Sequence, residues 1–319
     1  MRLSVRVRYS GTAALEPLLL AAEEYGYDGF WVSEPWGVDA SALLGWCAAR
    51  TRRIALGTHV ASVYARTPAA TAAMAATLQD VSGGRFRLGL GTSGPHVVEG
   101  WHGVPFERPL ARIRETVAAV RTVVAGEPVS HRDRRPLRTA LPGDVPPVPV
   151  YVGALGPRNQ ELTADVADGW TPTPFTPDEP AFALPLTKRL AGNDRAVAVA
   201  PTVPAAVGDA EAVRALERGW SALYLRGMGD FYAAAAETMG FGAMVAALRA
   251  APDRAAAKAA VTDDYVDAIG LFGPPERIRE RATRYVAAGV DELVVELRKP
   301  HLDDQLNDLR VLVETLKGL

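Results

Sequence analysis

A short glycine-containing stretch in the first third of the chain has residue types that suit anion binding. The run 86–91 (FRLGLG) alternates with a period of two and stops at glycine, as a strand does. It is followed by Thr92-Ser93-Gly94-Pro95, and Gly94 can adopt φ values that other residues avoid. Backbone N–H groups in such a turn can converge on an anion, although an ordinary tight turn also explains these four residues. The next loop, 97–103 (VVEGWHG), adds a carboxylate and two aromatic rings, which is typical of a pocket wall.

A second turn with the same property is predicted at Gly156-Pro157. It follows the strand-like run 150–155 (VYVGAL) and precedes a helix that starts at Arg158. The first N–H groups of a helix favour negative charge. We therefore expect the turns at Ser93-Gly94 and Gly156-Pro157 to hold one phosphate from two sides.

Few side chains in these loops can transfer protons. The candidates are Glu34, His59, His96, Glu99 and His102, and each can equally be a satisfied polar residue at a pocket rim. The histidines show no i, i+4 pair, so no metal site is expected, and no G-x-S-x-G motif provides a nucleophile. The chemistry is therefore expected to come from an organic cofactor.

The elements that must position these loops alternate between strand and helix along the chain. Strands are predicted at 3–7, 29–34, 54–60, 86–90, 150–155, 169–172, 196–203 and 291–297. Eight βα units predict one domain, 1–319, folded as an α/β (β/α)8 TIM barrel with its site at the C-terminal strand ends. These ends include Thr171-Pro172-Thr173 and Glu296. The alternative is an open doubly wound sheet, but residues 8–12 lack a G-x-G-x-x-G fingerprint.

Two other patterns qualify this plan. Six prolines in 126–149 predict a loop excursion with room for a small hairpin. Residues 25–32 and 288–295 share a helix-Gly-x-Asp-strand junction, and 167–170 is a weaker third copy, which supports a repeated βα unit.

Composition narrows the classes of partner. The 319 residues carry 35 basic and 37 acidic side chains, so neither nucleic acid nor an anionic membrane surface is expected as a partner. The chain opens directly in a strand pattern at 3–7, and no run approaches a membrane span. Cys47, alone in an apolar helical context, is expected to be a buried small hydrophobe. These features predict a soluble cytoplasmic protein with a small-molecule substrate.

The chain resembles the luciferase-like superfamily, and within it the branch of coenzyme F420-dependent oxidoreductases. The resemblance covers nearly the whole chain. It depends on 26–34 (GYDGFWVSE), 65–68 (ARTP), 78–91 (LQDVSGGRFRLGLG), 93–106 (SGPHVVEGWHGVPF), 148–170 (VPVYVGALGPRNQELTADVADGW) and 273–295. It implies a (β/α)8 barrel with a helical insertion after strand seven, here at about 227–260.

The resemblance also implies where a deazaflavin cofactor would bind. The ring would lie at the barrel mouth against strand three, where a bulge with a cis peptide that is not at proline maps to His59-Val60. Ser33 and Ser62 match positions that contact the ring or its side chain. The phosphate loop matches Ser93, Gly94 and Pro95, and its second half matches Leu155, Gly156 and Pro157.

Two positions depart from the family pattern. The family often has an apolar residue or glycine where this chain has His59, so an imidazole is expected to touch the ring. Glu34 and Pro95 replace the histidine and glutamate of the sugar-phosphate dehydrogenases, so glucose 6-phosphate is not expected as substrate. Glu34 and His59 are our candidates for catalysis.

The resemblance implies hydride transfer between F420 and a small organic substrate. The first alternative is an FMN-dependent monooxygenase that uses O2, and the second is a non-catalytic barrel that acts as a binding or subunit protein. Superfamily members are often dimers through the helices after strands one to three. The apolar residues Leu43, Leu44, Trp46 and Met74 fit such a homodimer and fit burial in a monomer equally well.

Overall fold

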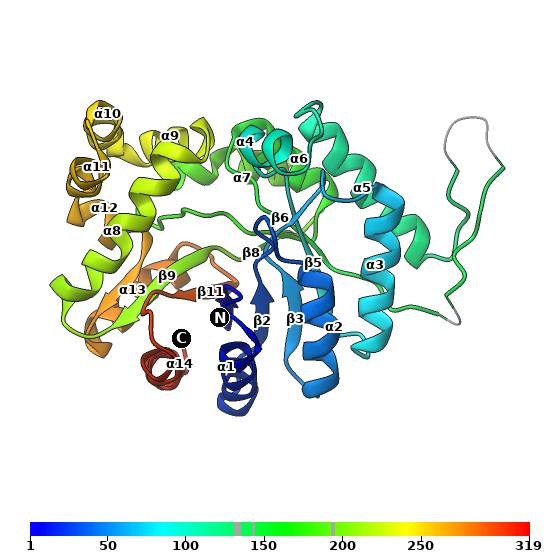
Figure 1. The fold of residues 1–319 in the computed structure, drawn as a ribbon, viewed down its shortest axis with the longest axis horizontal. Helices are drawn as coiled ribbons and strands as arrows, with labels where there is room; N and C mark the ends of the chain where they lie inside the picture. The colour runs from blue at the N-terminus through cyan, green and yellow to red at the C-terminus, as the bar shows by residue number, and fades with distance from the viewer. Residues whose placement is uncertain (131–134, 142–143, 193–194) are drawn as a thin grey trace.

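The strands of this protein form one parallel, curled sheet (Figure 1). The computed structural model describes residues 1–130, 135–141, 144–192 and 195–319. The strands within them are β1 (Arg2–Val7), β2 (Gly29–Val32), β3 (Ala55–Thr58), β4 (Ala61–Ser62), β5 (Phe86–Gly91), β6 (Val150–Val152), β7 (Gly169–Trp170), β8 (Ala198–Val199), β9 (Thr202–Val207), β10 (Leu271–Gly273) and β11 (Glu292–Leu297). Their order is β10-β9-β11-β1-β2-β3-β5-β6-β7-β8, and β4 pairs with β5 beside this path.

As a ladder of strand pairs the sheet is an open half-barrel, whereas the sequence predicts a closed ring of eight strands. The ends of the ladder are β10 and β8. One continuous strand was expected at 196–203, but β8 and β9 are separated by Ala200 and Pro201. Proline has no N–H to add to a ladder. Backbone bonds nevertheless reach both neighbours here: Ala200 donates to the carbonyl of Trp170 (2.8 Å) and Val294 donates to that of Pro201 (3.1 Å).

Helices follow most strands and cover the outside of the sheet (Figure 1). They are α1 (Thr12–Tyr25), α2 (Ala40–Arg50), α3 (Pro68–Val81), α4 (Pro95–Gly100), α5 (Pro109–Val124), α6 (Pro157–Val166), α7 (Leu184–Ala191), α8 (Ala210–Gly227), α9 (Asp230–Ala236), α10 (Gly242–Ala250), α11 (Arg254–Ala260), α12 (Asp263–Ile269), α13 (Pro275–Ala287) and α14 (Leu302–Leu316). The short η1 (Pro180–Ala183) and η2 (Glu237–Phe241) precede α7 and α10. Cys47 on α2 is fully buried, which confirms its predicted place in the core.

Side chains alternate along the central strands, with apolar residues toward the helices and polar or aromatic residues inside the curl. In β1, Leu3, Val5 and Val7 belong to the main hydrophobic core, whereas Ser4 donates to the buried carboxylate of Glu292 (2.6 Å). Inside the curl, a small separate cluster contains Trp31, Tyr151, Ala200 and Val294. These side chains fill the middle of the interior, and the pocket described below lies on the C-terminal side of them.

The repeated Gly-x-Asp junction has a structural role. Gly26 and Gly289 end their helices at φ 85° and 78°, a conformation that favours glycine. Each aspartate then accepts a 2.8 Å bond from a backbone N–H of the first or second residue of a neighbouring strand. The pairs are Asp28 with Leu3, Asp168 with Val150, and Asp291 with Val199. The junction therefore ties neighbouring strands together at their N-terminal ends, and the third copy predicted at 167–170 works in the same way.

Between β9 and β10 the chain is helical from α8 to α12. This run is longer than the predicted stretch 227–260, and its status as an insertion stays a prediction. Residues Asp230–Ala250 are long and apolar enough, by length and composition alone, to cross a membrane, so the prediction that no run approaches a membrane span was wrong by these two criteria. However, Gly240 interrupts the helix at φ 92°, and Ala236, Met244 and Val245 are buried in a second hydrophobic cluster. We therefore interpret this run as a packed helical layer.

The predicted excursion 126–149 projects from the rest of the fold (Figure 1). An antiparallel bridge between Val129 and Leu137 supports the small hairpin expected there. Residues 131–134 and 142–143 of this loop lie outside the described part of the chain.

Candidate active site

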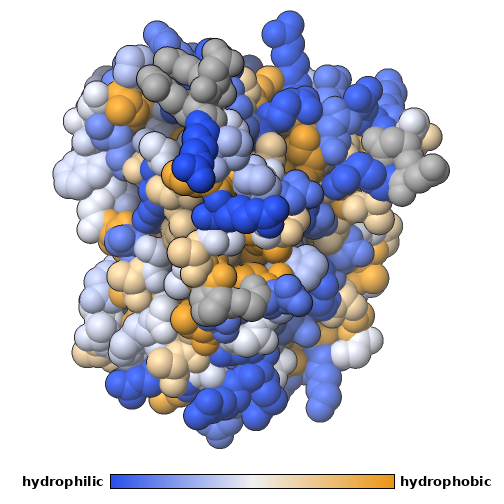
Figure 2. Space-filling view, turned by 90° about the vertical axis from the view of Figure 1, so that its right-hand side faces the viewer, coloured by the Kyte–Doolittle hydropathy of each residue, from blue (hydrophilic) through white to orange (hydrophobic). Residues whose placement is uncertain are grey.

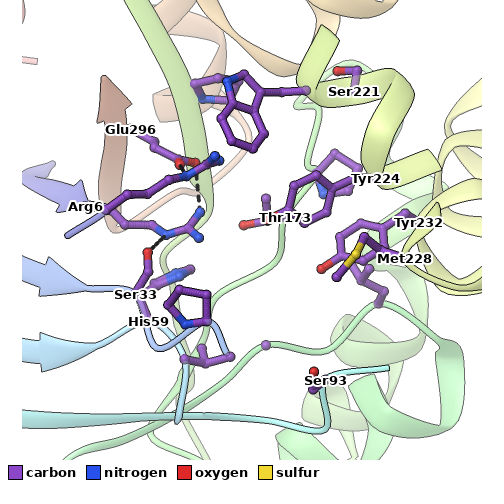
Figure 3. A pocket seen from close by; sticks show the side chains of 18 of the residues that line it. Arg6, Ser33, His59, Ser93, Thr173, Ser221, Tyr224, Met228, Tyr232 and Glu296 are labelled. Atoms are coloured by element: carbon purple, nitrogen blue, oxygen red, sulfur yellow. Dashed lines mark hydrogen bonds and ion pairs between the residues drawn. The ribbon is translucent and has the colours of Figure 1, made fainter. Parts of the chain in front are cut away.

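A pocket of about 230 Å³ opens at the C-terminal ends of the strands (Figure 3). Its lining includes six of the predicted cofactor residues: Ser33, His59, Val60, Ser62, Ser93 and Leu155. Gly94, Pro95, Gly156 and Pro157 do not line it directly but are the immediate neighbours of Ser93 and Leu155. The structure thus brings residues of β2, the β3 end, the β5 end and the β6 end to one cavity.

His59 forms part of the inner wall of this pocket and is almost completely buried. Its Nε2 lies 2.6 Å from the hydroxyl of Thr171 and 2.8 Å from that of Thr202. Thr171 donates its own proton to the carbonyl of Ala200 (2.8 Å), so it accepts from His59, which places the proton on Nε2. Burial, assisted by the positive charge of Arg6, lowers the pKa of His59 to about 3. The imidazole is therefore neutral at pH 7.

The bulge predicted at strand three is present. The peptide bond between His59 and Val60 is cis, as the family resemblance implies. Val60 fits beside β5 because Gly91 lacks a side chain: a Cβ on Gly91 would lie 2.5 Å from Cγ2 of Val60. The glycines of the FRLGLG run therefore make room for the bulge.

A buried ionic network continues the pocket wall beyond Ser33 and His59 (Figure 3). The carboxylate of Glu296 accepts from Arg6 (2.8 Å), Arg8 (2.6 Å) and Arg298 (2.9 Å). Arg298 also pairs with Glu217. Three cations and two anions meet here, so this wall carries one net positive charge.

Two arginines of the network have further contacts that fix them. Nε of Arg6 donates to the hydroxyl of Ser33 (2.9 Å), and the guanidinium of Arg8 stacks on Trp220 at 3.7 Å. Burial disfavours the ionised form of Glu296, but the arginines outweigh burial and lower its pKa far below the usual range. Glu296 is thus ionised at neutral pH.

The first anion-binding turn has a different backbone from the one predicted. Ser93 has the left-handed conformation, at φ 56°, whereas Gly94 is extended at φ −121° and precedes α4. Gly94 is needed for space, because a Cβ there would lie 3.1 Å from the carbonyl of Met228 at the end of α8. Among the described residues, no acceptor is found for the backbone N–H groups of Ser93, Gly94 and His96. The turn therefore offers free donors, as predicted, but by another geometry.

The second turn also has free donors. Gly156 precedes α6, and Pro157 is its first residue. Within the described chain, the N–H groups of Gly156 and Arg158 have no backbone acceptor. Since Leu155 and Ser93 line the same pocket, both turns border one space.

Glu34 lines the pocket but is already engaged. Its carboxylate binds Arg66 through both oxygens, at 2.7 and 2.8 Å, and accepts from the N–H of Ala40 (3.2 Å). These contacts hold the loop after β2. A catalytic role for Glu34 stays a prediction, and its oxygens leave little freedom to take up a proton.

Of the other proton-transfer candidates, one lines the pocket and two lie at the surface. His102 lines the pocket, whereas His96 is exposed and Glu99 accepts from the N–H of Phe106 (3.2 Å) at the surface. The pocket thus brings together Glu34, His59 and His102.

Sequence reasoning missed most of the remaining lining. A wall formed by α8, α9 and the residue after α8 contributes Trp220, Tyr224, Met228 and Tyr232. No local sequence motif predicts that these residues line a pocket. Arg6 and Arg8 did leave a signal, because in 3–8 (LSVRVR) the charged residues occupy the alternate positions of an apolar strand. That alternation points both arginines into the curl.

These features define a class: a parallel α/β fold with a pocket at the carboxyl ends of its strands, where a bulge and two turns with free N–H donors meet. A profile of the luciferase-like monooxygenase family matches residues 4–292. The chain therefore belongs to that family of oxidoreductases.

Individual relatives agree with this assignment. A proposed coenzyme F420-dependent oxidoreductase of Mycobacterium tuberculosis is 35% identical, over 98% of this chain and 99% of that protein. A 5,10-methylenetetrahydromethanopterin reductase of Methanolobus tindarius is 29% identical over 86% of each chain. The solved structure of a coenzyme F420-dependent tetrahydromethanopterin reductase from Methanopyrus kandleri matches with a TM-score of 0.80, over 99% of this chain and 98% of that one. At 21% identity, the last match shows the shared fold alone.

Proposed function

We propose that this protein is a coenzyme F420-dependent oxidoreductase that transfers a hydride between the deazaflavin and a small organic substrate. The observation that carries the proposal is that one pocket joins the His59-Val60 bulge to the two turns with free N–H donors. The full-length likeness to a proposed F420-dependent oxidoreductase supports the choice of cofactor. On this proposal the chain works as a (β/α)8 barrel completed at Ala200-Pro201, in the cytoplasm, and the helices between β9 and β10 are its insertion.

The residues of the pocket fit such a cofactor. The free N–H groups at Ser93, Gly94 and Gly156 suit a phosphate, and an extended Gly94 leaves the turn close against α8. The hydroxyl of Thr173 is buried in the pocket lining and has no partner among the described residues, so it is available to a bound molecule. A deazaflavin would supply two-electron hydride chemistry and would react poorly with O2.

The chain's own residues would then position the cofactor and the substrate and exclude water from them. His59 would present a neutral ring held by Thr171 and Thr202, so it would contact the cofactor without adding charge. The hydroxyl of Ser33 accepts from Arg6, which leaves its proton free to donate into the pocket. The ionic wall and the aromatic wall would enclose the substrate and exclude water.

The test is a comparison of cofactors. Purified protein is titrated with F420 and, separately, with FMN, and binding is followed by the fluorescence of each cofactor. We expect saturable binding of F420 and much weaker binding of FMN. Tight FMN binding without F420 binding would favour the monooxygenase alternative, and binding of neither would favour a non-catalytic homologue.

We also propose a homodimer through α2 and α3. Leu44 is fully buried within the chain, but Leu43, Trp46 and Met74 are only partly covered. Figure 2 shows the side of the molecule that lies at the right of Figure 1, and there hydrophilic and apolar residues are interspersed. Light scattering at micromolar concentration should give the mass of two chains, and a monomer would exclude this interface.

A further inference from the structure

The ionic wall of the pocket has more positive charge than its own anions neutralise. Six charged residues line the pocket: Arg6, Arg8, Glu34, Glu217, Glu296 and Arg298. Glu34 is neutralised from outside by Arg66. The remaining three arginines face only two carboxylates, so one positive charge in this wall has no counterpart.

The surplus charge has unused hydrogen-bond donors. Arg6 uses Nε for Ser33 and Nη1 for Glu296, and Arg8 uses only Nε, also for Glu296. In the part of the chain that the structure describes, no partner is found for Nη2 of Arg6 or for either terminal nitrogen of Arg8. The side chains of Arg6 and Arg8 are 12% and 29% exposed. Since both residues line the pocket, their free nitrogens are accessible from it.

The donors are also held rigidly. Trp220 supports the plane of Arg8, and Glu296 fixes the Nε edge of that guanidinium. Across the pocket, the unpartnered hydroxyl of Thr173 points toward the side of Arg6 (Figure 3). Two guanidiniums and one hydroxyl thus face a space in which, among the described residues, their free donors have no hydrogen-bond partner.

The position of these donors separates them from the proposed phosphate site. In Figure 3, Arg6 and Ser93 lie at opposite ends of the pocket. The region between them is bordered by two aromatic rings and a thioether, those of Tyr224, Tyr232 and Met228, and the hydroxyl of Tyr232 points into the pocket. A molecule bound between the two ends would therefore meet charge at one end and mainly aromatic surface along its body.

We propose that the substrate is a monoanionic organic acid with an apolar body, whose carboxylate binds Arg6 and Arg8. A carboxylate matches the fork of donors that a guanidinium presents, and one negative charge balances the surplus of the wall. The aromatic residues of α8 and α9 would cover the apolar body. This inference rests on the proposed function, because it takes the pocket to be the substrate site of an oxidoreductase, but its test requires no turnover.

The test uses matched acid and amide probes. Isothermal titration calorimetry measures the binding of 3-phenylpropanoate and of 3-phenylpropanamide, with and without saturating F420. Propanoate and decanoate extend the series to smaller and larger bodies. We expect 3-phenylpropanoate to bind at least tenfold more tightly than its amide, a difference of about 1.4 kcal/mol, and F420 to leave this preference in place.

Two variants separate charge recognition from general loss of structure. Arg8→Gln should weaken the acid about tenfold and leave the affinity for the amide unchanged. Arg112→Gln is the matched control, because Arg112 also stacks on an aromatic ring, that of Tyr64 (4.6 Å), but does not line the pocket. Arg112→Gln should alter neither affinity. Thermal melting checks that both variants are folded.

Four results would overturn the inference. They are equal affinities for acid and amide, no saturable binding of any of the three acids, an equal loss of acid and amide affinity in Arg8→Gln, and displacement of the acid by F420. The proposed function fails separately. A protein that binds the acids through Arg8 but does not bind F420 would uphold the carboxylate site and reject the F420-dependent activity.

Discussion

Replacement of His59 by glutamine should change how stability depends on pH. The pKa of His59 is lowered from 6.5 to about 3 by burial and by Arg6. Between these values the unfolded chain binds a proton at this residue that the folded chain does not. The free energy of unfolding therefore falls as pH decreases below 6.5, and this contribution is fully present only above that pH.

The size of the effect follows from the shift. At pH 5 an unfolded histidine is almost fully protonated, and linkage at about 1.4 kcal/mol per pH unit gives a loss of about 2 kcal/mol relative to pH 8. Glutamine does not titrate, and its amide can still donate to the hydroxyls of Thr171 and Thr202. His59→Gln should thus be less stable than the wild type at pH 8, by roughly 1–3 kcal/mol, and the gap should narrow by about 2 kcal/mol at pH 5.

Urea unfolding at pH 8, 7, 6 and 5 measures the difference in free energy of unfolding between the wild type and His59→Gln. The contributions of the other histidines cancel in this difference because both proteins contain them. A gap that stays constant from pH 8 to pH 5 would refute the assignment of His59 as a buried neutral residue. NMR provides an independent check: the ring signal of His59 should not titrate between pH 8 and pH 4. A midpoint near 6.5 would contradict the structure at this site.

Three further substitutions test other parts of the site. Ser93→Ala should weaken F420 binding roughly ten- to a hundredfold by removing one charge-assisted hydrogen bond, and unchanged affinity in a fluorescence titration would place the phosphate elsewhere. Gly91→Ala should lower the free energy of unfolding by about 1–3 kcal/mol in a urea titration, because the new Cβ would lie 2.5 Å from Cγ2 of Val60. Gly45→Ala is the control: its new Cβ would have no atom within 4 Å, so it should not be destabilising. Glu296→Gln should lower the free energy of unfolding by about 3–5 kcal/mol, since it leaves buried arginines without their anion; a loss below 1 kcal/mol by thermal and urea melts would show that the network is solvated.

The candidate site was predictable wherever one short stretch contains its determinants. The turns at Ser93-Gly94 and Gly156-Pro157 follow strand-like runs, so their place at the carboxyl edge of a parallel sheet followed from local pattern. The backbone detail did not follow. Gly94 was predicted to adopt the unusual conformation, but Ser93 adopts it. Glycine is needed at position 94 for another reason, the close carbonyl of Met228, which comes from a distant part of the chain.

The sequence by itself determined the βα alternation, the family, the bulge at His59-Val60 and the place of the two turns predicted to hold an anion. These depend on residues close together in the chain, or on motifs that the family shares. Only the tertiary structure decided that Glu296 faces Arg6 and Arg8 across about 290 residues, that burial and Arg6 keep His59 neutral between two distant threonines, and that Pro201 interrupts the ladder of strand pairs. The physical reason is that charge pairing and burial depend on which strands become neighbours when the sheet curls, and local patterns of hydrophobicity do not specify those distances.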